Sequence, residues 1–296
     1  MKPFRVWGTL AFLSLVWGTT WIAIKYSLEG IPPFLGATLR FSLALIILAA
    51  LALWRRTDLR LPPRAFTPVV SSAILLYLLD YGLIYWGEQY LNAGVTAVFF
   101  ATFPLFTALS SNLIFREERF DRNKIIGVLL GFAGTLVVFI EQVQATRFDA
   151  RISLASLAII LSALAAALSL VITKKFLSEV NTLSLTLHQM LWGTLSLAVT
   201  GFFLGEFRAF ELTLKVGAAV FYLGAFGSAL AFVLYYQLLK KMSSISLSYI
   251  IYITPLVALG AGYLLLGETL TWQTLLGTGI IFTGVFFSGG KRARKV

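Results

Sequence analysis

Two ionisable residues lie inside long apolar stretches of the chain, where a charge is costly. Arg40 falls in the stretch 33–54 and Asp80 in the stretch 66–87. Each lies about seven residues from the loop at the same side, which is roughly 10 Å deep at the rise of an α-helix. Ionisable groups inside a membrane usually pair with each other or mark a functional site. The matched depth predicts an ion pair that fixes two neighbouring helices. The alternatives are that the two residues contact a charged solute or couple to protons, or that they do not meet.

Aromatic and hydroxyl-bearing residues recur at helical spacing around these two positions. The candidates for a solute-binding pocket are Trp17, Trp21, Tyr77, Asp80, Tyr81, Phe99, Phe103, Tyr249 and Tyr252. Aromatic rings supply contact area and hydroxyls fix orientation, which suits an amphipathic ligand. Packing or lipid contact would explain any one aromatic residue equally well. Tyr and Asp at mid-depth avoid lipid, however, so the set as a whole predicts a central cavity.

Two prolines and one histidine are further candidates. Pro104 and Pro255 each fall in the middle of an apolar stretch, where a proline frees a backbone carbonyl and bends a helix. Either a fixed bend or a gating hinge is consistent with that placement. His188 could take up a proton near neutral pH, although a single histidine in a membrane is usually packed or interfacial.

The composition argues against several other kinds of chemistry. The chain has no Cys, one His and 13 carboxylates, so we expect no disulfide, no metal site and no cofactor. It also offers no cluster of nucleophile and base, and we expect no enzyme. The net charge of +11 comes from short clusters between apolar runs. That pattern is an orientation signal rather than a basic face, and nucleic-acid binding is not expected.

The elements that position these residues are predicted to be membrane-spanning helices. Hydrophobic residues make up 58% of the chain and charged residues 12%, whereas soluble domains average about 45–50% and 25%. Runs of about 20 apolar residues can span a bilayer as helices. The predicted spans are 6–27, 33–54, 66–87, 93–115, 124–141, 152–173, 183–204, 216–239, 244–266 and 271–289. The sequence therefore predicts an all-α integral membrane protein with ten transmembrane helices.

The distribution of Lys and Arg predicts the orientation of these spans. With the N-terminus in the cytoplasm, eighteen of the 24 basic residues fall on the cytoplasmic side and five on the other, while Arg40 lies within a span. Short cytoplasmic loops carry an excess of Lys and Arg. Both termini are therefore expected in the cytoplasm.

The second half of the chain repeats features of the first. The repeated residues are Pro104, Glu117, Gly127 and Gly134 in one half and Pro255, Glu268, Gly277 and Gly284 in the other. The offset is 151 residues at the prolines and glutamates and 150 at the glycines. An odd number of five spans per half inverts the second copy, giving repeats at 1–145 and 146–296. Inverted repeats around a central cavity are typical of transporters, with the substrate site at the repeat interface.

These residues also carry a family resemblance. The segment Trp17-Gly18-Thr19-Thr20-Trp21 with Lys25, Arg40 and the two repeated blocks resembles the drug/metabolite transporter superfamily, in its ten-span EamA branch. The resemblance implies eight helices around a central cavity, with spans five and ten at the periphery. Members of the branch export amino acids and other metabolites, and the aromatic-amino-acid exporter group passes large neutral side chains. The first half departs from the usual Gly-Glu with Arg116-Glu117-Glu118. The first span also lacks the carboxylate of small multidrug relatives, so their proton exchange is not implied.

The expected function is export of amino acids, above all large neutral or aromatic ones, or of similar small metabolites across a bacterial inner membrane by alternating access. The alternative is a transporter of nucleotide-sugars or other phosphorylated metabolites, which would need cations facing the cavity. The expected partners are a small-molecule substrate and the lipid bilayer. Small glycine faces at 127–134 and 277–284 would let spans five and ten pack on each other or on a second protomer, so a monomer and a homodimer both remain open.

Overall fold

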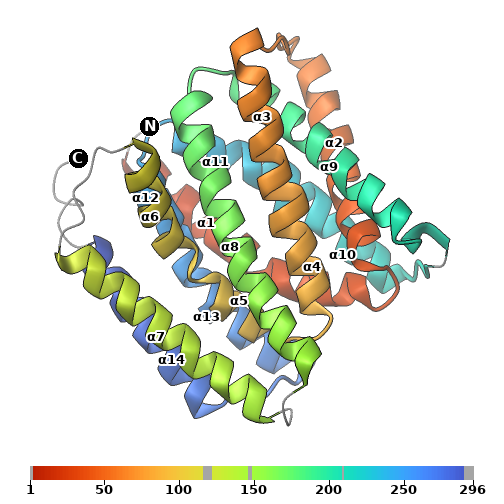
Figure 1. Cartoon of the computed structure of the whole chain (residues 1–296). Helices are drawn as coiled ribbons and strands as arrows, with labels where there is room; N and C mark the ends of the chain where they lie inside the picture. Colours follow the sequence, from red (N-terminus) through yellow and green to blue (C-terminus); the bar gives the residue numbers. More distant parts are fainter. Residues whose placement is uncertain (1–2, 116–121, 146–148, 209, 290–296) are drawn as a thin grey trace.

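The computed structural model describes residues 3–115, 122–145, 149–208 and 210–289. Helices account for nearly all of these residues, and none of the described residues forms a strand. The described helices form ten passages, as predicted. Figure 1 shows how they are arranged.

The first half contains five of these passages. They are α1 (Pro3–Leu28), α2 (Pro33–Trp54), the series η1 (Pro63–Ala65), α3 (Phe66–Ala73), η2 (Ile74–Tyr81) and α4 (Gly82–Glu88), the pair α5 (Ala93–Phe100) and α6 (Phe103–Phe115), and α7 (Arg122–Ala145).

The second half repeats the order. Its elements are α8 (Ala150–Phe176), α9 (Thr182–Phe203), the short η3 (Glu206–Arg208), the series α10 (Leu214–Gly224), η4 (Ala225–Leu230) and α11 (Ala231–Leu239), the series α12 (Ser244–Ser248), η5 (Tyr249–Tyr252), α13 (Ile253–Ala261) and η6 (Gly262–Leu266), and α14 (Trp272–Gly289).

Length and composition support a multi-pass membrane protein. Within the described residues, six helical passages are long and apolar enough to cross a bilayer, and shorter apolar helices accompany them. Large apolar side chains cover the outside of the bundle: Leu214 is 91% exposed and Phe203 81%. A soluble protein would bury such residues, so this surface faces lipid.

The interruptions of the helices recur at equivalent places in the two halves. The π-helical segments η2 and η4 begin 151 residues apart, at Ile74 and Ala225. The fourth passage breaks between α5 and α6, just before Pro104, and the ninth becomes a 3₁₀ turn just before Pro255. A proline lacks the N–H that a continuous helix needs, so the bend predicted at each proline is a break in the helix.

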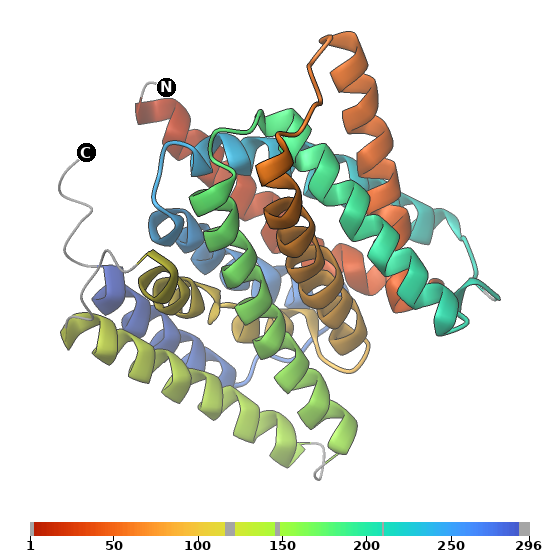
Figure 2. The same ribbon diagram turned by 45° about the horizontal axis from the view of Figure 1, so that its top comes forward.

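The packing of the helices has the twofold symmetry of inverted repeats. Helix α2 packs on its equivalent α9, and α7 packs on its equivalent α14. Helix α1 contacts α10 and α13 of the other half, and α8 makes the matching contacts with α3 and α6. The pair of α7 and α14 lies along one side of the bundle (Figures 1 and 2). In this pair Gly127 lies against Gly284 and Gly134 against Gly277, so the two helices are antiparallel.

Candidate binding cavity

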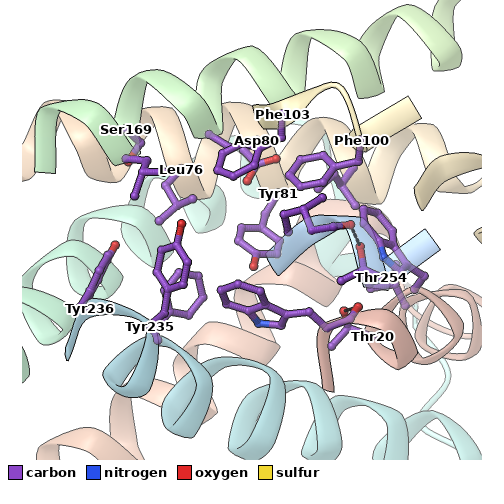
Figure 3. A pocket seen from close by; sticks show the side chains of 18 residues that line it. Thr20, Leu76, Asp80, Tyr81, Phe100, Phe103, Ser169, Tyr235, Tyr236 and Thr254 are labelled. Atoms are coloured by element: carbon purple, nitrogen blue, oxygen red, sulfur yellow. Dashed lines mark hydrogen bonds between the residues drawn. The ribbon is translucent and has the colours of Figure 1, made fainter. Parts of the chain in front are cut away.

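A cavity lies in the middle of the bundle, between the two halves (Figure 3). The empty space between its side chains, including its mouth, is about 730 Å³. Eight of its eighteen lining residues are aromatic, and most of the others are aliphatic. The lining residues are Trp17, Thr20, Trp21, Ile24, Leu76, Asp80, Tyr81, Ile84, Phe100, Phe103, Ala166, Ser169, Leu170, Phe232, Tyr235, Tyr236, Ile251 and Thr254.

The lining residues are contributed by equivalent positions of the two repeats. The equivalent pairs, 149 or 151 residues apart, are Trp17 and Ala166, Thr20 and Ser169, Trp21 and Leu170, Tyr81 and Phe232, Ile84 and Tyr235, Phe100 and Ile251, and Phe103 and Thr254. The cavity thus lies on the symmetry axis, as expected for a substrate site between inverted repeats.

Aromatic side chains from both halves contact one another around the cavity. Trp17 of α1 packs on Tyr235 of α11, with their ring centroids 5.0 Å apart. Trp21 packs on Phe100 at 5.5 Å, and Phe100 stacks on Phe103 at 5.7 Å with nearly parallel planes. Because each half supplies part of this wall, a movement of one half against the other changes the shape of the cavity.

The side chain of Trp17 is also anchored to the other half. Its Nε1 donates a hydrogen bond of 3.1 Å to the carbonyl of Gly227 in the π-helical segment η4. A π-helical turn leaves carbonyls displaced from the regular helical ladder, and such turns are frequent at functional sites. The π segment η2 likewise carries Asp80 and Tyr81 into the cavity.

The structure does not form the expected ion pair of Arg40 and Asp80. The Arg40 side chain is fully buried, its Nε donates to Ser228 Oγ at 2.8 Å, and Nη2 donates to the Gly227 carbonyl at 3.4 Å. Its guanidinium group also lies 4.6 Å from the centre of the Tyr81 ring. Arg40 therefore reaches across to η4 of the other half, and it remains only within electrostatic range of Asp80.

Asp80 lines the cavity with an unsatisfied carboxylate oxygen. The residue is 2% exposed, and its Oδ1 has no hydrogen-bond partner among the described residues. The hydroxyl of Ser162 on α8 lies close to the carboxyl group. A buried carboxylate oxygen without a partner is costly, so this atom is available to a ligand.

Among the other predicted pocket residues, Trp17, Trp21, Tyr81 and Phe103 line the cavity. Two others pack behind it: Tyr77 is fully buried against Phe41, at 4.7 Å between ring centroids, and Phe99 is fully buried as well. Tyr77 has the α-helical spacing of the lining residues Asp80 and Tyr81, but it lies in the π-helical segment η2, whose wider turn does not keep that spacing on one face. The side chains of Tyr249 and Tyr252 lie outside the described part of the structure.

The prolines and the histidine lie away from the cavity wall. Pro104 and Pro255 are buried at the starts of α6 and α13, next to the lining residues Phe103 and Thr254. His188 is half-buried on α9, with its Nδ1 2.8 Å from the carbonyl of Ser184 one turn earlier. Its side chain is therefore hydrogen-bonded within its own helix and does not line the cavity.

Sequence reasoning missed several lining residues of the second half. Phe232, Tyr235 and Tyr236 of α11 contact one another and form one wall. Figure 3 shows Tyr235 and Tyr236 across the cavity from Phe100. The signal was present in the repeat, because Phe232 and Tyr235 are the equivalents of Tyr81 and Ile84. Carrying the candidate Tyr81 across by the repeat offset would have identified Phe232, whereas Tyr235 and Tyr236 correspond to Ile84 and Tyr85, which were not among the predicted pocket residues.

Polar contacts join the two halves at the end of the bundle that carries Glu268, here called the Glu268 end. The carboxylate of Glu268 accepts hydrogen bonds from the backbone N–H groups of Ala93 at 2.7 Å and Gly94 at 3.1 Å, capping α5 from the other half. Lys215 and Glu29 form a salt bridge of 2.6 Å between the halves. The equivalent carboxylate, Glu117, lies outside the described residues.

A second carboxylate caps a helix at the same end. Glu206 of η3 accepts a hydrogen bond of 2.8 Å from the backbone N–H of Leu35 at the start of α2. Partial burial raises the pKa of this carboxyl group, and hydrogen bonds from the backbone of Leu35 and Phe34 offset part of that shift.

Two lysines donate hydrogen bonds to C-terminal carbonyls of helices at equivalent positions of the two halves. The Nζ of Lys25 donates to the carbonyl of Glu88 at 2.5 Å, and the Nζ of Lys174 donates to the carbonyl of Leu239 at 2.6 Å. Lys25 and Lys174 are 149 residues apart, and Glu88 and Leu239 are 151 apart. Each lysine thus caps the C-terminus of the third helical passage of its own half, at opposite ends of the bundle. No group of three His, Asp or Glu side chains suited to a metal ion occurs in the described residues.

An all-helical bundle of two inverted repeats around an interfacial cavity has the architecture of a secondary transporter. Comparison with known proteins agrees. The chain belongs to the EamA-like transporter family, whose model matches residues 6–140 and 153–290, once in each half.

Similar proteins include transporters from archaea and bacteria. An uncharacterized transporter of Archaeoglobus fulgidus is 28% identical over 289 residues, which covers 97% of this chain and 100% of that protein. The uncharacterized transporter YvbV of Bacillus subtilis is 30% identical, covering 93% and 88%. The uncharacterized inner membrane transporter YedA of Escherichia coli K12 is 28% identical, covering 97% and 91%. A crystal structure matches with a TM-score of 0.72 at 19% identity, covering 95% of both chains, and so shares the fold.

Proposed function

We propose that this membrane transporter exports large neutral or aromatic amino acids, or small metabolites like them, from the bacterial cytoplasm by alternating access. The observation that carries the proposal is the cavity on the symmetry axis, which is lined by eight aromatic residues from both halves. Aromatic walls favour a planar or apolar side chain. The neutral Nε1 of Trp21, which has no partner among the described residues, is a donor for a carboxylate.

Alternating access follows from the pseudo-symmetry of the bundle. The positive-inside rule places the Glu268 end on the outer side and both termini in the cytoplasm. Release to the outside then requires the contacts of Glu268 with Ala93 and Gly94, and of Lys215 with Glu29, to separate. We propose that the helix breaks ahead of Pro104 and Pro255 act as the hinges of this movement, because they are equivalent and adjoin the cavity.

Transport of nucleotide-sugars or other phosphorylated metabolites is not favoured. Such substrates need cationic side chains in the cavity. The described lining contains no Lys or Arg, and Arg40 is directed behind Tyr81 toward Ser228.

The test is uptake of radiolabelled amino acids into proteoliposomes that contain the purified protein, with and without a pH gradient. We expect uptake of phenylalanine and leucine above that of protein-free vesicles. Tyr81→Ala should raise the half-saturation concentration by about tenfold or more, because it removes a ring from the cavity wall. The matched control is Tyr263→Ala, since Tyr263 is 57% exposed on the surface of the bundle. No uptake of any amino acid, or equal kinetics for the two variants, would refute the assignment.

A further inference from the structure

Asp80 differs from every other described residue of the cavity wall in being charged. It is carried into the cavity by the π-helical segment η2 and is almost fully buried. Figure 3 shows its carboxyl group above Tyr81, between the aromatic side chains. Burying a carboxylate in an apolar wall costs free energy unless a cation or a hydrogen-bond donor pairs with it.

The protein itself leaves this carboxylate incompletely paired. Arg40, the nearest cation, donates to Ser228 and to the Gly227 carbonyl of the other half, and Tyr81 covers its guanidinium group on the cavity side. Ser162 lies beside Asp80, but its hydroxyl donates to the Ile159 carbonyl at 2.8 Å. The Oδ1 atom of Asp80 therefore keeps its full accepting capacity.

The aliphatic hydroxyls of the wall are occupied within the protein, whereas the Nε1 of Trp21 has no partner among the described residues. Thr20, Ser169 and Thr254 each direct their hydroxyl to a main-chain carbonyl, at 2.7, 2.8 and 2.7 Å. Eight lining residues carry aromatic rings, whose faces have negative electrostatic potential and attract ammonium groups. The cavity thus combines one acceptor anion with several ring faces, and its described lining has no cation to neutralise an anionic ligand.

We infer that Asp80 binds the ammonium group of the substrate, and that the cavity selects protonated amines with an apolar or aromatic body, whether or not they carry a carboxylate. This rests on the proposed function, because it assigns the recognition step of the same cavity. Amino acids satisfy the requirement through their amino group. Decarboxylated amines satisfy it better, since they bring no negative charge toward Asp80.

The experiment measures binding of four phenyl compounds of different charge to the purified full-length protein by isothermal titration calorimetry. The probes are phenethylamine, phenylalanine, neutral phenethyl alcohol and anionic 3-phenylpropionate. We expect phenethylamine to bind most tightly, about 10- to 100-fold more tightly than the alcohol, as a charge-assisted hydrogen bond would give. 3-Phenylpropionate should bind most weakly.

Asp80→Asn should abolish the preference for phenethylamine over the alcohol. The control is Asp58→Asn, which changes an exposed carboxylate far from the cavity lining and should keep the full preference. If Asp80→Asn does not yield folded protein, the affinities of the four compounds for the unmodified protein still test the inference. Equal binding of amine, alcohol and propionate, or an unchanged preference in folded Asp80→Asn, would overturn the inference.

Uptake of radiolabelled phenylalanine and phenethylamine into proteoliposomes separates this inference from the proposed function. Phenylalanine uptake without any preference for amines in binding overturns the inference and leaves amino-acid export standing. Amine binding and uptake without phenylalanine uptake supports the inference and overturns amino-acid export. Absence of binding and of uptake for both compounds overturns the two proposals together.

Discussion

The pairing of α7 with α14 depends on glycines, and Gly284→Ala tests that dependence. A Cβ atom at position 284 would lie 2.6 Å from the carbonyl oxygen of Gly127 and 2.8 Å from the backbone nitrogen of Gly131. Both are main-chain atoms, so no side-chain rotation can relieve the contact. Ordinary contacts of a Cβ begin at 3.4 Å, and the helices would have to separate by up to 0.8 Å.

The size of the effect follows from the cost of overpacking. Inserting a methyl group into a filled helix contact costs about 1–3 kcal/mol. Gly279→Ala is a control in the same helix, because its Cβ would meet nothing within 4 Å. Both substitutions gain the same helix propensity, about 1 kcal/mol, so their difference isolates the steric cost. The apparent melting midpoint of Gly284→Ala should therefore be about 2–6 °C below that of Gly279→Ala.

The assay is thermal unfolding in detergent, followed by circular dichroism, together with uptake into proteoliposomes. The half-saturation concentration for the transported solute should stay unchanged, since neither helix lines the cavity. Equal midpoints for the two variants would refute the close contact of the helices. A changed half-saturation concentration in the folded Gly284→Ala protein would refute the view that this pair only supports the bundle.

Two further predictions concern the Glu268 end. Glu268→Gln removes a negative charge that caps α5 from the other half, so we expect this end to open more often. Opening can be measured at Ser27, a buried residue at the same end, after the substitution Ser27→Cys. Because the chain has no Cys, an impermeant maleimide added outside labels only this introduced cysteine. Labelling should rise several-fold over the same background with the exposed Glu179→Gln, and equal rates would contradict a closing role. The second prediction uses Glu206, whose pKa burial raises above its ordinary 4.5, so that the folded state binds this proton more tightly than the unfolded state does. The contribution of the protonated Glu206 to stability is present below pH 4.5 and is lost as the pH rises through the pKa of the folded state. Over this pH range, the melting midpoint of the unmodified protein should fall relative to that of Glu206→Gln. Parallel pH profiles of the two proteins would show that folding does not change the pKa of this carboxyl group.

The sequence alone determined the class of this protein and the plan of its fold. Apolar runs of spanning length must form helices in a bilayer, because every backbone N–H and C=O needs a partner there. The repeat of Pro104 and Glu117 at Pro255 and Glu268, with an odd number of spans in each half, determined that the halves are inverted. The breaks before both prolines also followed from local chemistry, since proline cannot continue the hydrogen-bond ladder.

Only the tertiary structure decided which side chains meet. Equal depth suggested that Arg40 pairs with Asp80, but depth does not specify the rotation of a helix or the direction of a long side chain, and Arg40 turns to Ser228 and Gly227. The π-helical segment η2 shifts the register of the third passage, and the pattern of apolar residues in the sequence did not predict a π-helix there. The wall formed by Phe232, Tyr235 and Tyr236 exists because the second half folds back over the first. Contacts between residues about 150 positions apart depend on the packing of whole helices. The second-half wall of the predicted cavity, and the Oδ1 of Asp80 that has no partner among the described residues, therefore became visible only in three dimensions.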